Sequence, residues 1–239
     1  MKLYKNLLIL LLFILTISTN CFALTVGAAI SLQNPLKEIA RTYPGEISFV
    51  WGATGDIIKQ INAGAPIDML AALYDKKYRE LQLKPVYIAT NTLVLALSKK
   101  SPIRITSIEE LNKVSLFSVG NPATVPLGEY GEQVLKHYKL YDSLKKKIIY
   151  CTNAAQVISY LTRGEVDGAF VYKTDFDKVK DNLIKVTDID AKIHAPIIYA
   201  AGVTKVGADN REAEKFLHYL KSEKARSVFR RFGFGAIND

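Results

Sequence analysis

The chain has 239 residues and a formal net charge of +9, and 49% of its residues are hydrophobic. This length suits two modest lobes or one large domain with a substantial core. A positive surface raises the encounter rate with anions, but the lysines and arginines are scattered and are not interleaved with aromatic residues, which argues against nucleic-acid binding.

Residues 1–23 have the pattern of a secretory signal peptide. Lys2 and Lys5 precede an apolar run over residues 7–15 that is too short for a comfortable membrane span. Small residues at the two positions that a signal peptidase reads then place the cleavage after Ala23. We therefore expect the chain to be exported to the periplasm.

The two cysteines are expected in different parts of the protein, one in the signal peptide and one in the exported chain. Cys21 lies in the signal peptide, and a lipid anchor there is not favoured because residues 18–20 lack the aliphatic residue that lipidation signals carry. Cys151 is the one cysteine of the exported chain, so no internal disulfide can form. An exported hydrolase or transferase with Cys151 as its nucleophile is an alternative, although a buried structural cysteine is favoured. No recognisable motif contains the histidines that would assist it, His137, His194 and His218.

Short apolar runs alternate with segments of helical spacing along the exported chain. Segments 154–161 and 213–220, for example, carry apolar residues at i, i+3, i+4 and i+7. Strands that alternate with helices predict an α/β fold with mainly parallel sheets buried on both faces. The predicted strands are Leu24–Ala29, Ile47–Trp51, Met69–Ala72, Leu93–Leu97, Leu116–Val119, Lys147–Tyr150, Gly168–Tyr172, Leu183–Val186 and Ile197–Val203.

These nine strands are many for a single sheet, which favours two lobes. A chain that leaves the first lobe, builds the second and returns would need two crossings, and the candidates are Ile88–Leu93 and Ala195–Tyr199. We therefore expect lobe 1 to comprise residues 24–88 and 200–239, and lobe 2 to comprise residues 89–199.

Four strand ends lead into helices through small or hydroxyl residues, which is the local pattern of an anion site. Ser31 follows the first strand as an expected N-cap, and Thr54 follows the second. In the second half, Asn121–Gly128 and the stretch ending in Ala154 occupy equivalent places. Tyr172 ends a buried strand and could also donate a hydrogen bond to an anion.

Five sequence motifs in order resemble the periplasmic molybdate-binding proteins of ABC transporters. They are Ala-Ala-Ile-Ser-Leu at 28–32, Asn-Ala-Gly-Ala-Pro-Ile-Asp at 62–68, the stretch 120–130 with Val-Pro-Leu-Gly at its centre, Gly-Glu-Val-Asp-Gly-Ala-Phe-Val-Tyr at 164–172, and 216–220 with 232–234. The resemblance implies a two-lobed periplasmic binding protein fold with the ligand in the cleft. It also implies a monomeric, non-enzymatic protein that delivers its ligand to a permease and its ATPase.

The resemblance also implies how the ligand is held. Members of that family bind molybdate or tungstate without a counter-charge, a cofactor or a metal cation, through hydroxyls and backbone N–H groups of both lobes. The matching positions here are Ser31 and Thr54 with their hydroxyls, Leu127 and Ala154 with their backbone N–H groups, and Tyr172 with its hydroxyl.

The chain departs from the family pattern at three positions. Leu127 replaces a smaller alanine, Thr54 adds a methyl group to the usual serine, and Asp56 places a carboxylate beside the second hydroxyl. A carboxylate that faced a dianion would repel it. Asp56 and Leu127 support an alternative in which the same fold binds another oxyanion or a small organic acid.

Overall fold

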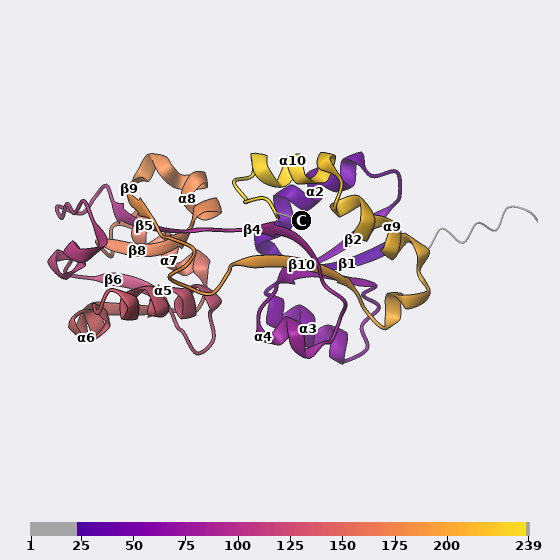
Figure 1. Ribbon diagram of the computed structural model, residues 1–239, viewed down its shortest axis with the longest axis horizontal. Coiled ribbons are helices and arrows are strands. Elements are labelled where there is room, and N and C mark those ends of the chain that lie inside the picture. Colours follow the sequence, from indigo (N-terminus) through magenta and orange to yellow (C-terminus); the bar gives the residue numbers. More distant parts are fainter. Residues whose placement is uncertain (1–22, 238–239) are drawn as a thin grey trace, which may run out of the picture.

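The computed structural model describes residues 23–237, so the expected signal peptide lies outside the described residues except for Ala23. The described chain forms two lobes side by side, each built on a five-stranded sheet (Figure 1). The two-lobed α/β fold expected from the sequence is confirmed. No helix among residues 23–237 is both long and apolar enough to cross a membrane.

The first sheet has the strand order β2-β1-β3-β10-β4. In it β1 runs parallel to β2 and β3, whereas β10 runs antiparallel to β3 and β4. Its strands are β1 (Leu24–Ala29), β2 (Ile47–Gly52), β3 (Met69–Leu73), β4 (Val86–Thr90) and β10 (Ile198–Val203). Figure 1 shows two helix layers, with α2 (Gln33–Thr42), α9 (Arg211–Leu220) and α10 (Glu223–Arg231) above, and α3 (Thr54–Asn62) and α4 (Lys76–Glu80) below.

The second sheet repeats this arrangement with the order β7-β6-β8-β5-β9. Here β6 runs parallel to β7 and β8, and β5 runs antiparallel to β8 and β9. The strands are β5 (Leu93–Ser98), β6 (Phe117–Gly120), β7 (Ile148–Cys151), β8 (Gly168–Tyr172) and β9 (Leu183–Asp188). The surrounding helices are α5 (Pro126–His137), α6 (Tyr141–Leu144), α7 (Ala154–Arg163) and α8 (Lys173–Val179).

Burial on both faces holds only for the inner strands. Every residue of β3, β5 and β8 is buried, as a continuous apolar run predicts. The edge strands β2 and β7 keep partly exposed residues, because one side of each has no neighbouring strand. The prediction of fully buried strands is therefore wrong at the edges.

The chain crosses between the sheets twice. Asn91 and Thr92 alone separate β4 from β5, and residues 189–197 separate β9 from β10. The sequence did not predict β4, whose last residues were assigned to the first crossing. The expected lobe boundaries at 88/89 and 199/200 fall inside β4 and β10. The strands of the first sheet lie within residues 24–90 and 198–203, and those of the second sheet lie within residues 93–188.

The reversed strand of each sheet is the one that has just arrived from the other lobe, and this fixes where the strands end. Leu93, the first residue of β5, pairs with Tyr172 at the end of β8. Tyr199, near the start of β10, pairs with Leu73 at the end of β3. The carboxyl ends of β1, β2 and β3 in lobe 1, and of β6, β7 and β8 in lobe 2, therefore face the boundary between the lobes (Figure 1).

Candidate functional site

In lobe 1, two adjacent strands end side by side and lead into helical turns. Ala29 of β1 pairs with Gly52 of β2. Ser31 is the middle residue of the 3₁₀ turn η1 (Ile30–Leu32), and Thr54 is the first residue of α3. Because first-turn N–H groups have no acceptor inside their own helix, this edge presents donors toward lobe 2. The N-cap role expected for Ser31 is wrong, since Ala29 caps η1 and Leu32 caps α2, both without a side-chain hydrogen bond.

Lobe 2 carries the matching pair of helix starts. Gly120 of β6 pairs with Cys151 of β7. Leu127 is the second residue of α5. Ala154 opens α7, whose N-cap Asn153 accepts a hydrogen bond from the Gln156 N–H at 2.8 Å. The backbone N–H groups of Leu127 and Ala154 thus lie in first helical turns at the edge that faces lobe 1.

The turn before Leu127 depends on two glycines. A Cβ on Gly128 would lie 1.9 Å from the carbonyl oxygen of Gly120, and a Cβ on Gly120 would lie 2.9 Å from the Gly128 nitrogen. The backbones therefore approach more closely than any larger residue permits. The Leu127 side chain is only 1% exposed and packs into the lobe 2 core. The core accommodates its additional bulk, and the side chain does not narrow the cleft.

Tyr172 lies in a group of buried polar side chains at the lobe boundary. Burial raises its pKa well above the usual value, and the neighbouring Tyr199, Tyr130 and Asp175 raise it further. Asp75 of lobe 1 acts on the pKa of both Tyr172 and Tyr130, so the two lobes are close here. A raised pKa keeps the phenol protonated at neutral pH, and it can therefore donate to an anion.

Sequence analysis missed Tyr199, which connects the two halves of this group. The side chains of Ser31 and Asn91 lie close to Tyr199, and both partly oppose the rise of its pKa that burial causes. Asn91 in turn donates from Nδ2 to Oγ1 of Thr174 at 3.0 Å. Ser31 of lobe 1 and Tyr199 thus lie close to Asn91, which bonds the start of α8 in lobe 2.

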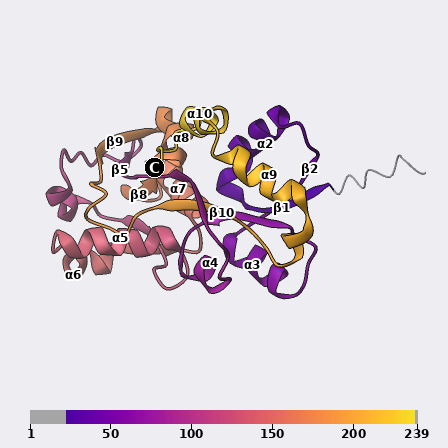
Figure 2. The same ribbon diagram turned by 45° about the vertical axis from the view of Figure 1, so that its right-hand side comes forward.

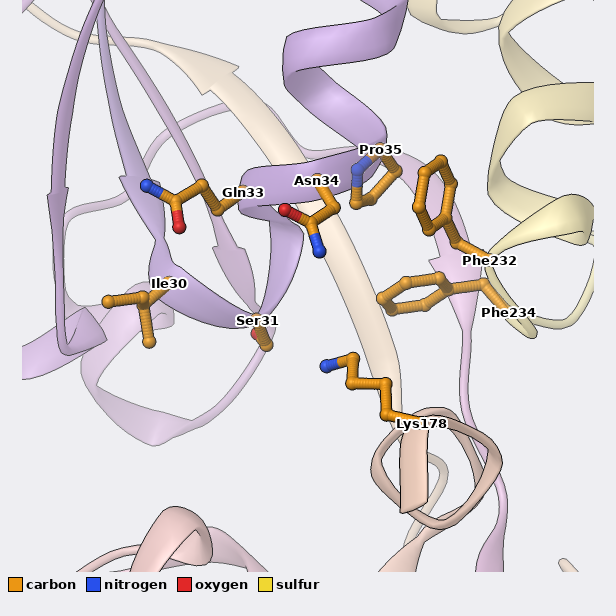
Figure 3. Close-up of a pocket in the computed structure, with 8 residues that line it drawn as sticks. All are labelled: Ile30, Ser31, Gln33, Asn34, Pro35, Lys178, Phe232 and Phe234. Carbon is orange, nitrogen blue, oxygen red and sulfur yellow. The ribbon is translucent and has the colours of Figure 1, made fainter. Parts of the chain in front are cut away.

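A pocket of about 180 Å³ opens beside Ser31 (Figure 3). Lys178 of α8 reaches into it from lobe 2, and its Nζ lies 2.9 Å from Oδ1 of Asp175. The remaining lining residues come from lobe 1: Ile30, Gln33, Asn34, Pro35, Phe232 and Phe234. Of the five predicted site residues, Ser31 lines this pocket. Thr54, Leu127, Ala154 and Tyr172 lie at the facing edges of the sheets but outside its lining.

Asp56 is exposed and paired with a lysine of its own helix. Its side chain is 67% exposed and lies 3.4 Å from Nζ of Lys59. The carboxylate therefore remains in solvent, where its repulsion of an anion in the cleft is screened.

Cys151 is buried, and burial raises the pKa of its thiol. Thiolate chemistry requires the opposite environment. Residues 23–237 contain no cluster of histidine, cysteine or acidic side chains that could hold a metal ion. The cysteine-nucleophile alternative thus gains no support from the position of Cys151.

The chain has two α/β lobes that are joined by two connecting segments, and the edges that carry hydrogen-bond donors face each other. This arrangement defines a periplasmic-type solute-binding protein. The chain belongs to the family of bacterial extracellular solute-binding proteins, whose family model matches residues 24–235.

Individual relatives agree with this family. The chain is 33% identical to YvgL of Bacillus subtilis, named as a candidate ABC transporter substrate-binding lipoprotein, over 92% of this chain and 89% of that protein. It is 31% identical to the molybdate-binding protein ModA of Haemophilus influenzae, over 89% of both chains. Among solved structures, the substrate-binding domain of a candidate molybdenum ABC transporter from Clostridium difficile superposes with a TM-score of 0.78 at 29% identity, covering 90% of this chain and 99% of that one.

Proposed function

We propose that this protein is the substrate-binding component of an ABC importer and that it captures molybdate, or the similar dianion tungstate, between its lobes. The observation that carries the proposal is the set of uncharged donors at the facing strand ends. Ser31 and Thr54 belong to lobe 1, and Leu127, Ala154 and Tyr172 belong to lobe 2. Relatives that are named for molybdate or molybdenum support this ligand.

Binding would follow from the strength of neutral donors in a water-excluded cleft. Hydrogen bonds strengthen as the local dielectric falls, so closure of the lobes over the anion turns weak dipoles into strong ones. A ligand that bridges both lobes shifts the population toward the closed form. Lys178 would add little net charge, because Asp175 already pairs with it. Size, rather than charge, would then separate molybdate from sulfate.

The proposed partners are a membrane permease and its ATPase, to which the loaded protein would deliver the anion. Neutral donors allow release when the permease separates the lobes, since no buried ion pair has to be broken. Export to the periplasm and action as a monomer complete the proposal, and no enzymatic activity is required of the chain.

Calorimetric titration with molybdate, tungstate, sulfate and phosphate tests the proposal. We expect one site per chain for molybdate and tungstate, with binding at least about a hundredfold weaker for sulfate, which corresponds to roughly 2.7 kcal/mol. Absence of molybdate binding, or tighter binding of sulfate, would refute it.

A second candidate ligand is a small organic acid bearing an anionic group. The pocket beside Ser31 supports it, because Asn34, Phe232 and Phe234 provide an amide and an aromatic wall beyond what a bare oxyanion needs. Lactate and phosphonoacetate in the same titration distinguish the two ligand classes.

A further inference from the structure

Asn91 occupies a special place in the shorter crossing between the lobes. On one side, Thr90 forms a bridge with Gly235, with N···O distances of 3.0 and 2.9 Å. On the other side, the carbonyl oxygen of Thr92 accepts the N–H of Lys173, the first residue of α8, at 2.8 Å. Asn91 is therefore the residue between a point fixed to lobe 1 and a point fixed to lobe 2.

The hydrogen bonds of Asn91 reach both crossings and both lobes. Its N–H donates to the carbonyl oxygen of Ile197 in the second crossing at 3.0 Å, and its Oδ1 accepts the N–H of Thr92 at 2.9 Å. Its Nδ2 donates to Oγ1 of Thr174 at 3.0 Å, and its side chain lies close to Tyr199. Asn91 is 7% exposed and Thr174 is 3% exposed, so water competes little with these bonds.

Both neighbours of the Asn91 side chain lie next to proposed ligand donors. Tyr199 lies close to Ser31, one of the proposed donors of lobe 1. Thr174 lies two residues after Tyr172, one of the proposed donors of lobe 2 and the residue that caps the start of α8. If one lobe rotates relative to the other, the geometry around Asn91 must therefore change or one of its hydrogen bonds must break.

We propose that Asn91 is a positioning residue of the anion site, which sets the distance and orientation of Ser31 relative to Tyr172 through its hydrogen bonds to Thr174 in lobe 2 and to Ile197 in the second crossing. This inference rests on the proposed function, because the site that it positions is the proposed oxyanion site. It assigns to the crossing a role in affinity that is separate from contact with the ligand.

A double-mutant cycle on molybdate binding tests the proposal, with Asn91→Ala, Thr174→Val and the double variant. We expect Asn91→Ala to raise the Kd about tenfold, mostly through faster dissociation, because one buried hydrogen-bonding group is lost. The double variant should bind within about twofold of Asn91→Ala alone, since both changes break the same connection. Asn112→Ala, which loses a bond to Ser143 elsewhere in lobe 2, is the matched control and should bind as the unaltered protein does.

Three results would overturn the inference. The first is that Asn91→Ala leaves both the Kd and the dissociation rate for molybdate unchanged. The second is that Asn91→Ala lowers the melting temperature and changes nothing else. The third is that the effects of Asn91→Ala and Thr174→Val on the Kd are fully additive. Should Asn91→Ala fail to fold, Tyr199→Phe and Thr174→Val decide, and unchanged dissociation in both contradicts the proposal. If the unaltered protein does not bind molybdate, the proposed function fails instead, which separates the two failures.

Discussion

The side chain of Ser31, just after the first strand, lies beside Tyr199 in the last strand of the same sheet and lowers the pKa of its phenol. The sign of this effect makes the Ser31 hydroxyl the donor and the phenol oxygen the acceptor. Because a serine hydroxyl has one proton to donate, it must turn away from Tyr199 before it can donate to an anion.

Replacement of Ser31 by alanine removes this hydroxyl. We expect Ser31→Ala to weaken molybdate binding by roughly 1.5–3 kcal/mol, because a charge-assisted hydrogen bond is lost. Calorimetric titration gives the change in Kd. Ser227→Ala, which loses a hydroxyl bonded to Lys224 on α10, is the control. Equal affinity in Ser31→Ala and this control would remove Ser31 from the site.

The substitution Leu127→Ala distinguishes a role of the Leu127 side chain from a role of its backbone N–H. Its side chain is buried in the lobe 2 core, so Leu127→Ala should lower the free energy of unfolding by about 2–5 kcal/mol. Its backbone N–H is unchanged, and the Kd for molybdate should stay within about threefold, or 0.65 kcal/mol. Urea unfolding and titration measure the two quantities. A Kd more than about tenfold higher in the folded variant would show that the side chain matters to the site.

Gly128 tests the turn that carries the Leu127 N–H. In Gly128→Ala the new Cβ would lie 1.9 Å from the Gly120 carbonyl oxygen, so the backbone must move. We expect both stability and molybdate affinity to fall, the latter by more than about 1 kcal/mol. Gly64→Ala is the control, because Gly64 has a φ of +82° but no atom within 4 Å of a new Cβ. It should lose about 1 kcal/mol of stability and no affinity.

Alkaline pH should destabilise the protein through its buried tyrosines. Burial raises the pKa of Tyr172 and Tyr199 above the value of about 10 expected in the unfolded chain. The stability that these protonated phenols contribute is complete below pH 10 and is lost as the pH rises toward the folded pKa values. Urea unfolding between pH 8 and 11 should show this loss, and Tyr172→Phe should reduce its slope. An identical slope in the variant would contradict the assignment.

Asp167 should govern part of the acid stability of lobe 2. Burial acts to raise its pKa, but hydrogen bonds from Ser101 and from the N–H groups of Ser115 and Leu116 lower it overall. The carboxylate therefore stabilises the fold above a pH of about 4 and loses this effect as the pH falls through its lowered pKa. Asp167→Asn should cost about 1–3 kcal/mol at pH 7 and much less near pH 2. A pH-independent cost would show that shape, not charge, matters there.

The sequence predicted the two-lobed architecture because strand and helix periodicities are local. It failed at β4, which was assigned to a crossing because two residues alone separate it from β5. It located the helix starts at Thr54 and Ala154 through strand ends followed by small residues. It gave Ser31 the wrong local role, since the true partner of that hydroxyl lies in a distant strand.

Tyr199 and Asn91 had no sequence signal of their own. Tyr199 lies inside an apolar strand, and only the pairing of β10 with β3 brings it to the lobe boundary. Lys178 was not singled out from the sequence, and its place in the pocket depends on how the lobes sit together (Figure 3). Contacts of this kind depend on the packing of two lobes, which no local pattern encodes.

Strand order also constrains when each lobe can fold during biosynthesis. β10 lies between β3 and β4, although it is made after all the strands of lobe 2. The segment after α10 approaches α8 of lobe 2 in both views (Figures 1 and 2). Lobe 2 is a continuous stretch of chain and can complete its sheet first, whereas the sheet of lobe 1 lacks its fourth strand until β10 has been made. A nascent chain of this topology therefore cannot complete its first lobe before its second.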